Sequence, residues 1–174
     1  MTDAPEVLFP SQLWKQLPTD RKVVAAEAFW RDDNAAAEQA EVIATIAQRL
    51  KFRAKSVVAM PVEKKTRQLM SLPAVSEAVA ARILVAYHLV HQRPLMGRFL
   101  DALGIANEDG LISDENLTPP ETEHLATAAQ TLAASFPAED VSLYLSTLLW
   151  QDSSTWGNLA GLPEVRQASH PSAV

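Results

Sequence analysis

Two of the four histidines, His88 and His91, lie three positions apart in the segment YHLVHQRP. On a helix this spacing places both imidazole rings on one side, where two neutral rings can bind one metal ion. A protein metal site needs at least a third ligand, and the one further candidate with a motif is Glu121-x-x-His124. In di-iron helical bundles that motif occurs twice, beside two more glutamates on other helices. This sequence contains it once.

A structural role explains these residues more simply. Histidines in the last turn of a helix can bond to the terminal carbonyl groups and interact favourably with the negative end of the helix dipole. Glu121 follows Thr118 by three positions, which predicts a capping box at the start of a helix. We therefore expect no cofactor, and we keep a metal-dependent helical enzyme built on His88, His91, Glu121 and His124 as a further alternative.

Motifs of other common sites do not occur in the sequence. The absence of cysteine excludes disulfides and thiolate metal sites. The chain has no G-x-G-x-x-G or G-x-x-x-x-G-K-[ST] loop to hold phosphate, and no G-x-S-x-G motif for a serine hydrolase. Segment 105–116 is as acidic as a calcium-binding loop, but Ile105 and Asn116 occupy the first and last ligand positions of an EF-hand alignment. The sequence therefore favours a protein without catalytic activity.

Charge is segregated along the chain. Residues 1–48 carry a net charge of −4, residues 49–100 carry +8, and residues 101–174 carry −10, for a total of −6. The segment 49–67 contains seven basic residues and one acidic residue, Glu63. The seven are Arg49, Lys51, Arg53, Lys55, Lys64, Lys65 and Arg67.

This basic segment has two interpretations. Cations contact nucleic-acid phosphates, which supply most of the non-specific affinity for nucleic acid. The same cations can instead complement the acidic C-terminal third, within one chain or across a dimer. The acidic total charge disfavours nucleic acid, and Phe52 is the one aromatic ring that the segment offers for base stacking.

The four tryptophans divide into two pairs. Trp30 and Trp150 fall on expected helices, and we expect them in the core. Trp14 and Trp156 fall in less regular segments. Because tryptophan is enriched at the centres of protein interfaces, we expect Trp14 and Trp156 to contact a partner.

Hydrophobic periodicity and capping signals predict helices that would position these residues. The helix at 74–92 is apolar nearly all round, so we expect it to be the buried centre of the fold. Segment 105–117 is a polar connection with an Asp109-Gly110 turn, and no segment has a strand pattern. The expected helices are 19–31, 34–52, 61–70, 74–92, 94–104, 118–136 and 137–150.

These elements predict an all-α fold, a compact array of about six or seven helices around the buried helix at 74–92. We expect one helical domain over residues 1–160, with 105–117 as a candidate point of sub-division, followed by a flexible tail at 161–174. The N-terminus lacks a signal-peptide pattern and no apolar run reaches the length of a membrane span, so we expect a cytoplasmic protein.

The sequence ranks three functions. A protein–protein interaction or adaptor module that can self-associate comes first, with an unknown protein or a second copy of the chain as partner. A nucleic-acid-binding accessory protein that uses residues 49–67 is the alternative, and the metal-dependent enzyme is third.

Overall fold

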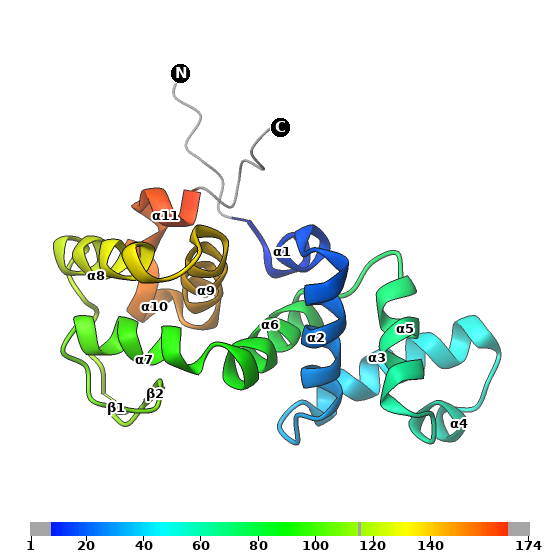
Figure 1. Ribbon diagram of the computed structural model, residues 1–174. Coiled ribbons are helices and arrows are strands. Elements are labelled where there is room, and N and C mark those ends of the chain that lie inside the picture. Colours follow the sequence, from blue (N-terminus) through cyan, green and yellow to red (C-terminus); the bar gives the residue numbers. More distant parts are fainter. Residues whose placement is uncertain (1–7, 115, 167–174) are drawn as a thin grey trace, which may run out of the picture. The chain divides into compact units, whose positions relative to one another are not determined.

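The expected all-α fold is confirmed. The computed structural model describes residues 8–114 and 116–166, and helices make up most of these residues. One short pair of strands accompanies them within the described ranges (Figure 1). None of the described helices has the length and apolar character needed to cross a bilayer.

The described chain forms two compact units. The first, here called the basic unit, spans Pro10–Val90, and the second, the acidic unit, combines Leu8 and Phe9 with the described residues from His91 onward. The boundary therefore falls at the end of the helix expected at 74–92, and not in the 105–117 connection. That the two units act as one domain remains a prediction.

The basic unit consists of helices joined by short links. Helix α2 packs along α5, and α3 contacts both α4 and α5 (Figure 1). The small residues Ala25 and Ala26 of α2 are fully buried, as are the larger Phe29, Ile46 and Leu69. The helices are α1 (Pro10–Gln16), α2 (Thr19–Trp30), α3 (Ala36–Leu50), α4 (Ala54–Val58), α5 (Val62–Ser71) and α6 (Glu77–His91).

Helix α6 is the helix predicted at 74–92, and it begins three residues later. The Ser76 hydroxyl accepts a hydrogen bond from the backbone N–H of Val79, which caps the helix at this point. Most residues of α6 between Val79 and His88 are buried. Val90 also belongs to the helix that we expected to be buried, but it is exposed.

The acidic unit is built around α9, which contacts α8, α10, α11 and the 3₁₀-helix η1. All ten residues from Asp140 to Leu149 are buried. Burial raises the pKa of the Tyr144 hydroxyl, because the phenolate would lose its hydration. The unit contains α7 (Arg93–Ala102), β1 (Asn107–Glu108), β2 (Leu111–Ile112), α8 (Thr122–Ser135), α9 (Ala138–Gln151), α10 (Ser153–Trp156), η1 (Gly157–Gly161) and α11 (Pro163–Arg166).

Two sequence-based expectations about the ends of elements need correction. The predicted capping box does not form, because α8 begins at Thr122 and Glu121 occupies the N-cap position without a side-chain hydrogen bond. Residues 161–166, expected to belong to a flexible tail, are part of the packed structure, since Leu162 and Val165 are buried and α11 contacts α9. The rest of that tail, residues 167–174, lies outside the described residues.

Asp152 caps α10 with its carboxylate, which accepts hydrogen bonds from the backbone and the hydroxyl groups of Ser154 and Thr155. These hydrogen bonds, those of the two hydroxyl groups first, lower the pKa of the Asp152 carboxyl group. The capped turn starts the chain's return from α9 toward α11.

The Asp109-Gly110 turn predicted in the polar connection joins β1 and β2 into a two-stranded hairpin. Both turn residues have positive φ, as a type I′ hairpin requires. The hairpin lies so close to α7 that a Cβ atom on Gly110 would be 2.7 Å from the Met96 Cβ and 3.2 Å from the Arg93 carbonyl oxygen. Glycine is therefore needed at residue 110 for both its backbone conformation and its lack of a side chain.

Two glycines with positive φ allow the contribution of this close packing to be measured. Gly104, with φ 70° after α7, has nothing within 4 Å of a built Cβ, so Gly104→Ala should lose about 1–2 kcal/mol from backbone strain alone. Gly110→Ala should lose about 2–4 kcal/mol, because a steric clash is added. Urea unfolding of the full chain measures both, with Gly161→Ala as an unstrained control. Equal losses for Gly104→Ala and Gly110→Ala would contradict the packing of the hairpin on α7.

Candidate nucleic-acid interface

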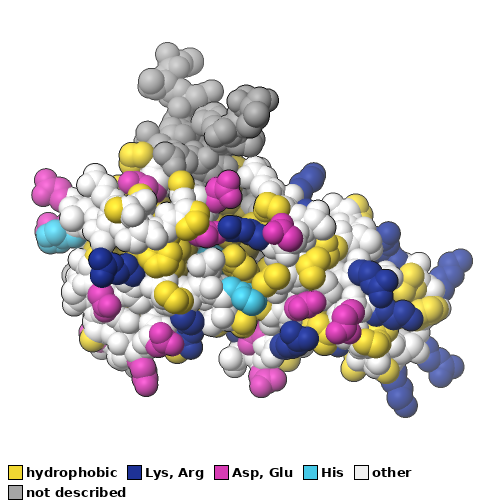
Figure 2. Space-filling model, viewed as in Figure 1, with side chains coloured by type: hydrophobic (Ala, Val, Ile, Leu, Met, Phe, Trp, Pro, Cys, Tyr) yellow, Lys and Arg dark blue, Asp and Glu magenta, His cyan; other side chains and the backbone are white. Residues whose placement is uncertain are grey.

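The seven cations predicted between residues 49 and 67 lie on the surface of the basic unit. Six are exposed and Lys65 is half-buried. Figure 2 shows lysine and arginine side chains gathered over the part of this unit that α4, α5 and the end of α3 form. We call this set the basic surface; it consists of Arg49, Lys51, Arg53, Lys55, Lys64, Lys65 and Arg67.

Acidic side chains do not neutralise this surface. Across residues 8–114 and 116–166, no ion pair joins any of the seven cations to a carboxylate. Two of the seven make other contacts: the Arg49 guanidinium donates to the Ser71 carbonyl at the end of α5, at 3.1 Å, and the Lys65 ammonium lies 5.0 Å from the ring centre of Trp30. Neither contact removes a positive charge, so the surface is available to an anionic ligand.

The turn between α3 and α4 places a ring between two cations. Lys51 ends α3 in the left-handed conformation, with φ 56°. The next backbone N–H, that of Phe52, donates to the Ala47 carbonyl at 2.9 Å, and Arg53 is the N-cap residue of α4. The Phe52 side chain is 52% exposed. A helix end and a helix start thus fix the backbone on both sides of this exposed ring.

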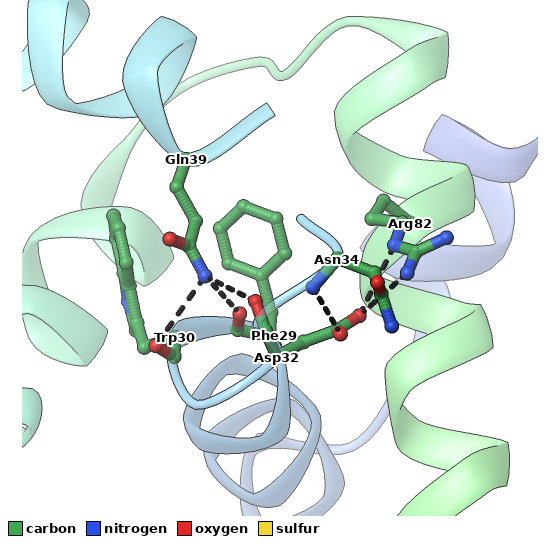
Figure 3. Close-up of polar contacts among 6 residues, drawn as sticks. All are labelled: Phe29, Trp30, Asp32, Asn34, Gln39 and Arg82. Carbon is green, nitrogen blue, oxygen red and sulfur yellow. Dashed lines mark hydrogen bonds and ion pairs between the residues drawn. The ribbon is translucent and has the colours of Figure 1, made fainter. Parts of the chain in front are cut away.

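A polar cluster on the opposite end of α3 holds the helices that carry the basic surface (Figure 3). The Gln39 amide donates to the carbonyl oxygens of Phe29, Trp30 and Asp32, at 2.7, 3.3 and 3.0 Å. These carbonyl groups lie at and just after the end of α2, where the helical hydrogen-bond pattern stops. The carbonyl oxygens of Phe29 and Asp32 also accept the backbone N–H groups of Asp32 and Ala35. The Asp32 carboxylate accepts from the Arg82 side chain of α6 at 3.1 Å.

The sequence-based reading missed this cluster. Its members are spread over fifty residues of the sequence, and no local motif relates Asp32 to Arg82. The polar position of Gln39 within the apolar pattern of α3 was the available signal, because a glutamine amide near a helix end can supply donors to carbonyl groups.

The tryptophans differ from two expectations. Trp14 and Trp156, expected to contact a partner, are buried, so neither indole is presented on the surface. Trp30 is buried as predicted, whereas Trp150, expected in the core, is 39% exposed and its Nε1 donates to the Leu8 carbonyl at 2.7 Å. Trp14 and Trp156 belong to the short helices α1 and α10, which we did not expect from the sequence.

The four residues considered for a metal site occupy separate environments. His88 is buried, and its Nδ1–H donates to the Leu84 carbonyl at 2.7 Å, whereas His91 is exposed at the end of α6. Glu121 and His124 are exposed at the start of α8. Within the part of the chain that the structure describes, no group of three His, Asp or Glu side chains is arranged to hold a metal ion.

Comparison of the chain with models of protein families, with curated protein sequences and with solved structures finds no match. Functional inference therefore depends on the residues of this chain.

The Gln39 amide allows a test of what supports the basic surface. Gln39→Ala removes the donor to three carbonyl groups and should lower the free energy of unfolding by about 1–2 kcal/mol. Gln39→Glu should lose more at neutral pH, because a carboxylate only accepts hydrogen bonds and would repel the carbonyl oxygens.

Thermal and urea unfolding of the full chain measure these losses. Gln48→Glu makes the same chemical change at an exposed position of α3 and should change the stability by less than about 0.5 kcal/mol. A Gln39→Glu variant as stable as Gln48→Glu would refute the role of this amide.

Proposed function

We propose that this chain is a binding module whose basic unit contacts the phosphate backbone of nucleic acid through the basic surface. The observation that carries the proposal is the exposure of six of seven clustered cations without a carboxylate partner among the described residues. Arginine and lysine contacts to phosphates supply the sequence-independent part of nucleic-acid affinity.

The charge of the basic unit supports this proposal better than the charge of the chain does. Residues 10–90 contain 12 basic and 8 acidic side chains, for a net charge of +4, although the whole chain carries −6. At physiological salt the screening length is about 8 Å, so a ligand at the surface responds mainly to nearby charges. The acidic total charge is therefore a smaller obstacle than the sequence alone implies.

Binding of a labelled mixed-sequence oligonucleotide of about 20 nucleotides, followed by fluorescence anisotropy, tests the proposal. Binding should be measurable at about 50 mM salt and should weaken at least about tenfold at about 200 mM, because bound cations release counterions from the phosphates. The paired substitutions Lys51→Glu and Arg53→Glu should weaken binding by about tenfold or more at the lower salt concentration.

The matched control is the pair Lys15→Glu and Arg31→Glu, two exposed cations of the same unit outside the basic surface. This pair changes the net charge by the same amount and should leave binding within about threefold of the unchanged protein. Equal losses for the two pairs would show a general effect of net charge, and absence of binding at the lower salt concentration would refute the proposal.

We propose, second, that copies of the chain associate through opposite charges, in keeping with an adaptor that self-associates. The sequence outside residues 10–90 contains 3 basic and 13 acidic side chains, for a net charge of −10. Many of these acids are exposed on the acidic unit, including Asp101, Glu108, Glu121 and Glu123. They are complementary to the basic surface of a second copy.

Sedimentation velocity at about 50 and 500 mM salt tests self-association, because opposite charges attract less as the screening length falls. The chain should associate at the lower salt concentration and become monomeric at the higher one, and Lys51→Glu with Arg53→Glu should remain monomeric at both. A chain that stays monomeric at high protein concentration, or an oligomer that salt does not affect, would exclude charge-driven association.

A further inference from the structure

We propose that Phe52 is a stacking platform for an unpaired base, so that the basic surface prefers single-stranded over double-stranded nucleic acid. This inference rests on the nucleic-acid binding proposed above. It is carried by one observation: Phe52 is 52% exposed at the turn from α3 to α4, and its two neighbours in the chain are the exposed cations Lys51 and Arg53.

The backbone of Phe52 is fixed before any ligand binds. The Phe52 backbone is anchored by its hydrogen bond to Ala47, and the residues on either side belong to the end of one helix and the cap of the next. An aromatic side chain has two rotatable bonds, so little conformational entropy remains to be lost when a base stacks on it. A single exposed apolar residue needs no special explanation, but an exposed ring on an anchored backbone, with a cation on each side in the sequence, matches the composition of single-strand binding sites.

The chemistry of the ligand follows from what each group recognises. Lysine and arginine on both sides of the ring can contact successive phosphates, while the ring offers its face to the base between them. In a duplex the bases are already stacked on one another, and their faces are not accessible without unpairing. An exposed ring therefore adds affinity for a single strand and adds little for a duplex.

An anionic membrane surface is the other ligand that combines negative charge with apolar contact. Surface-bound proteins usually insert the apolar face of an amphipathic helix that is rich in large side chains. Helix α4 has five residues, and Val58 is its one exposed large apolar side chain. The basic surface thus offers little apolar area to a bilayer, and nucleic acid is the better match.

The experiment compares one fluorescent strand of about 20 nucleotides, alone and annealed to its complement, with the full-length chain and three variants. Phe52→Ala should weaken binding to the single strand by about fivefold or more and should change binding to the duplex by less than about twofold. Phe52→Trp should restore single-strand binding, because its larger ring also stacks. Val58→Ala, which shortens the other exposed apolar side chain nearby, should bind as the unchanged protein does.

Salt dependence separates stacking from charge. The slope of the logarithm of affinity against the logarithm of salt concentration should be the same for Phe52→Ala and the unchanged protein, since no cation is lost. The pair Lys51→Glu and Arg53→Glu should make this slope less steep, because two cations no longer contact phosphates.

Each other outcome has a definite meaning. If the chain binds both ligands and Phe52→Ala binds the single strand normally, or loses equally on strand and duplex, the stacking role is wrong and the proposed function stands. If neither ligand binds at low salt, the proposed function fails and this inference fails with it. Binding to vesicles containing phosphatidylserine, without binding to either nucleic acid, would assign the basic surface to a membrane.

Discussion

The end of α2 is the constraint on which the basic unit depends. A helix leaves its last carbonyl groups without internal donors, and these groups cost free energy wherever they are withdrawn from water. The Gln39 side chain supplies the donor from the start of α3, and Asp32 ties the same turn to Arg82 on α6. The Gln39 amide therefore joins the start of α3 to the end of α2, together with the backbone hydrogen bond from Ala35 to Asp32. The cations of Arg49 and Lys51 lie at the other end of α3.

Charge segregation gives the molecule its second organising feature. Cations gather where α3, α4 and α5 meet, while the sequence outside residues 10–90 is strongly acidic. Ion pairs do not neutralise the basic surface within the described residues, and two of its seven cations make contacts inside the fold, Arg49 with the Ser71 carbonyl and Lys65 with the Trp30 ring. We proposed a ligand to explain why these exposed cations cluster, and that ligand is nucleic acid or another copy of the chain.

Most of the helical framework could be predicted from the sequence. Long helices such as α3 and α9 span several turns, so their periodicity is visible in the sequence, and Pro137 marks the start of α9. The short helices α1, α4 and α10 span too few turns to show a period, and the buried Trp14 and Trp156 lie in two of them, α1 and α10. The helix that is buried over ten consecutive residues is α9, and the Thr147 hydroxyl is accommodated there because it donates to the Leu143 carbonyl four residues earlier.

The candidate site was predictable as a composition but not as a surface. Seven cations in nineteen residues could be read directly, whereas their exposure depends on how α3, α4 and α5 pack. From the sequence, Phe52 is the one aromatic ring of the basic segment, and that number disfavours base stacking. The sequence does not show that this ring is exposed at the junction of two helices, next to Lys51 and Arg53 in the chain. The polar cluster of Gln39, Asp32 and Arg82 needed long-range contacts that no local pattern contains.

The left-handed backbone at Lys51 has a consequence for evolution and engineering of this chain. A non-glycine residue in that conformation costs about 1–2 kcal/mol, and glycine or asparagine would relieve much of it. The lysine adds positive charge to the basic surface at the position where the backbone is strained. Under the proposed function, stability and ligand affinity are opposed at this residue, so a screen for higher stability would select against the charge that a screen for tighter binding would keep.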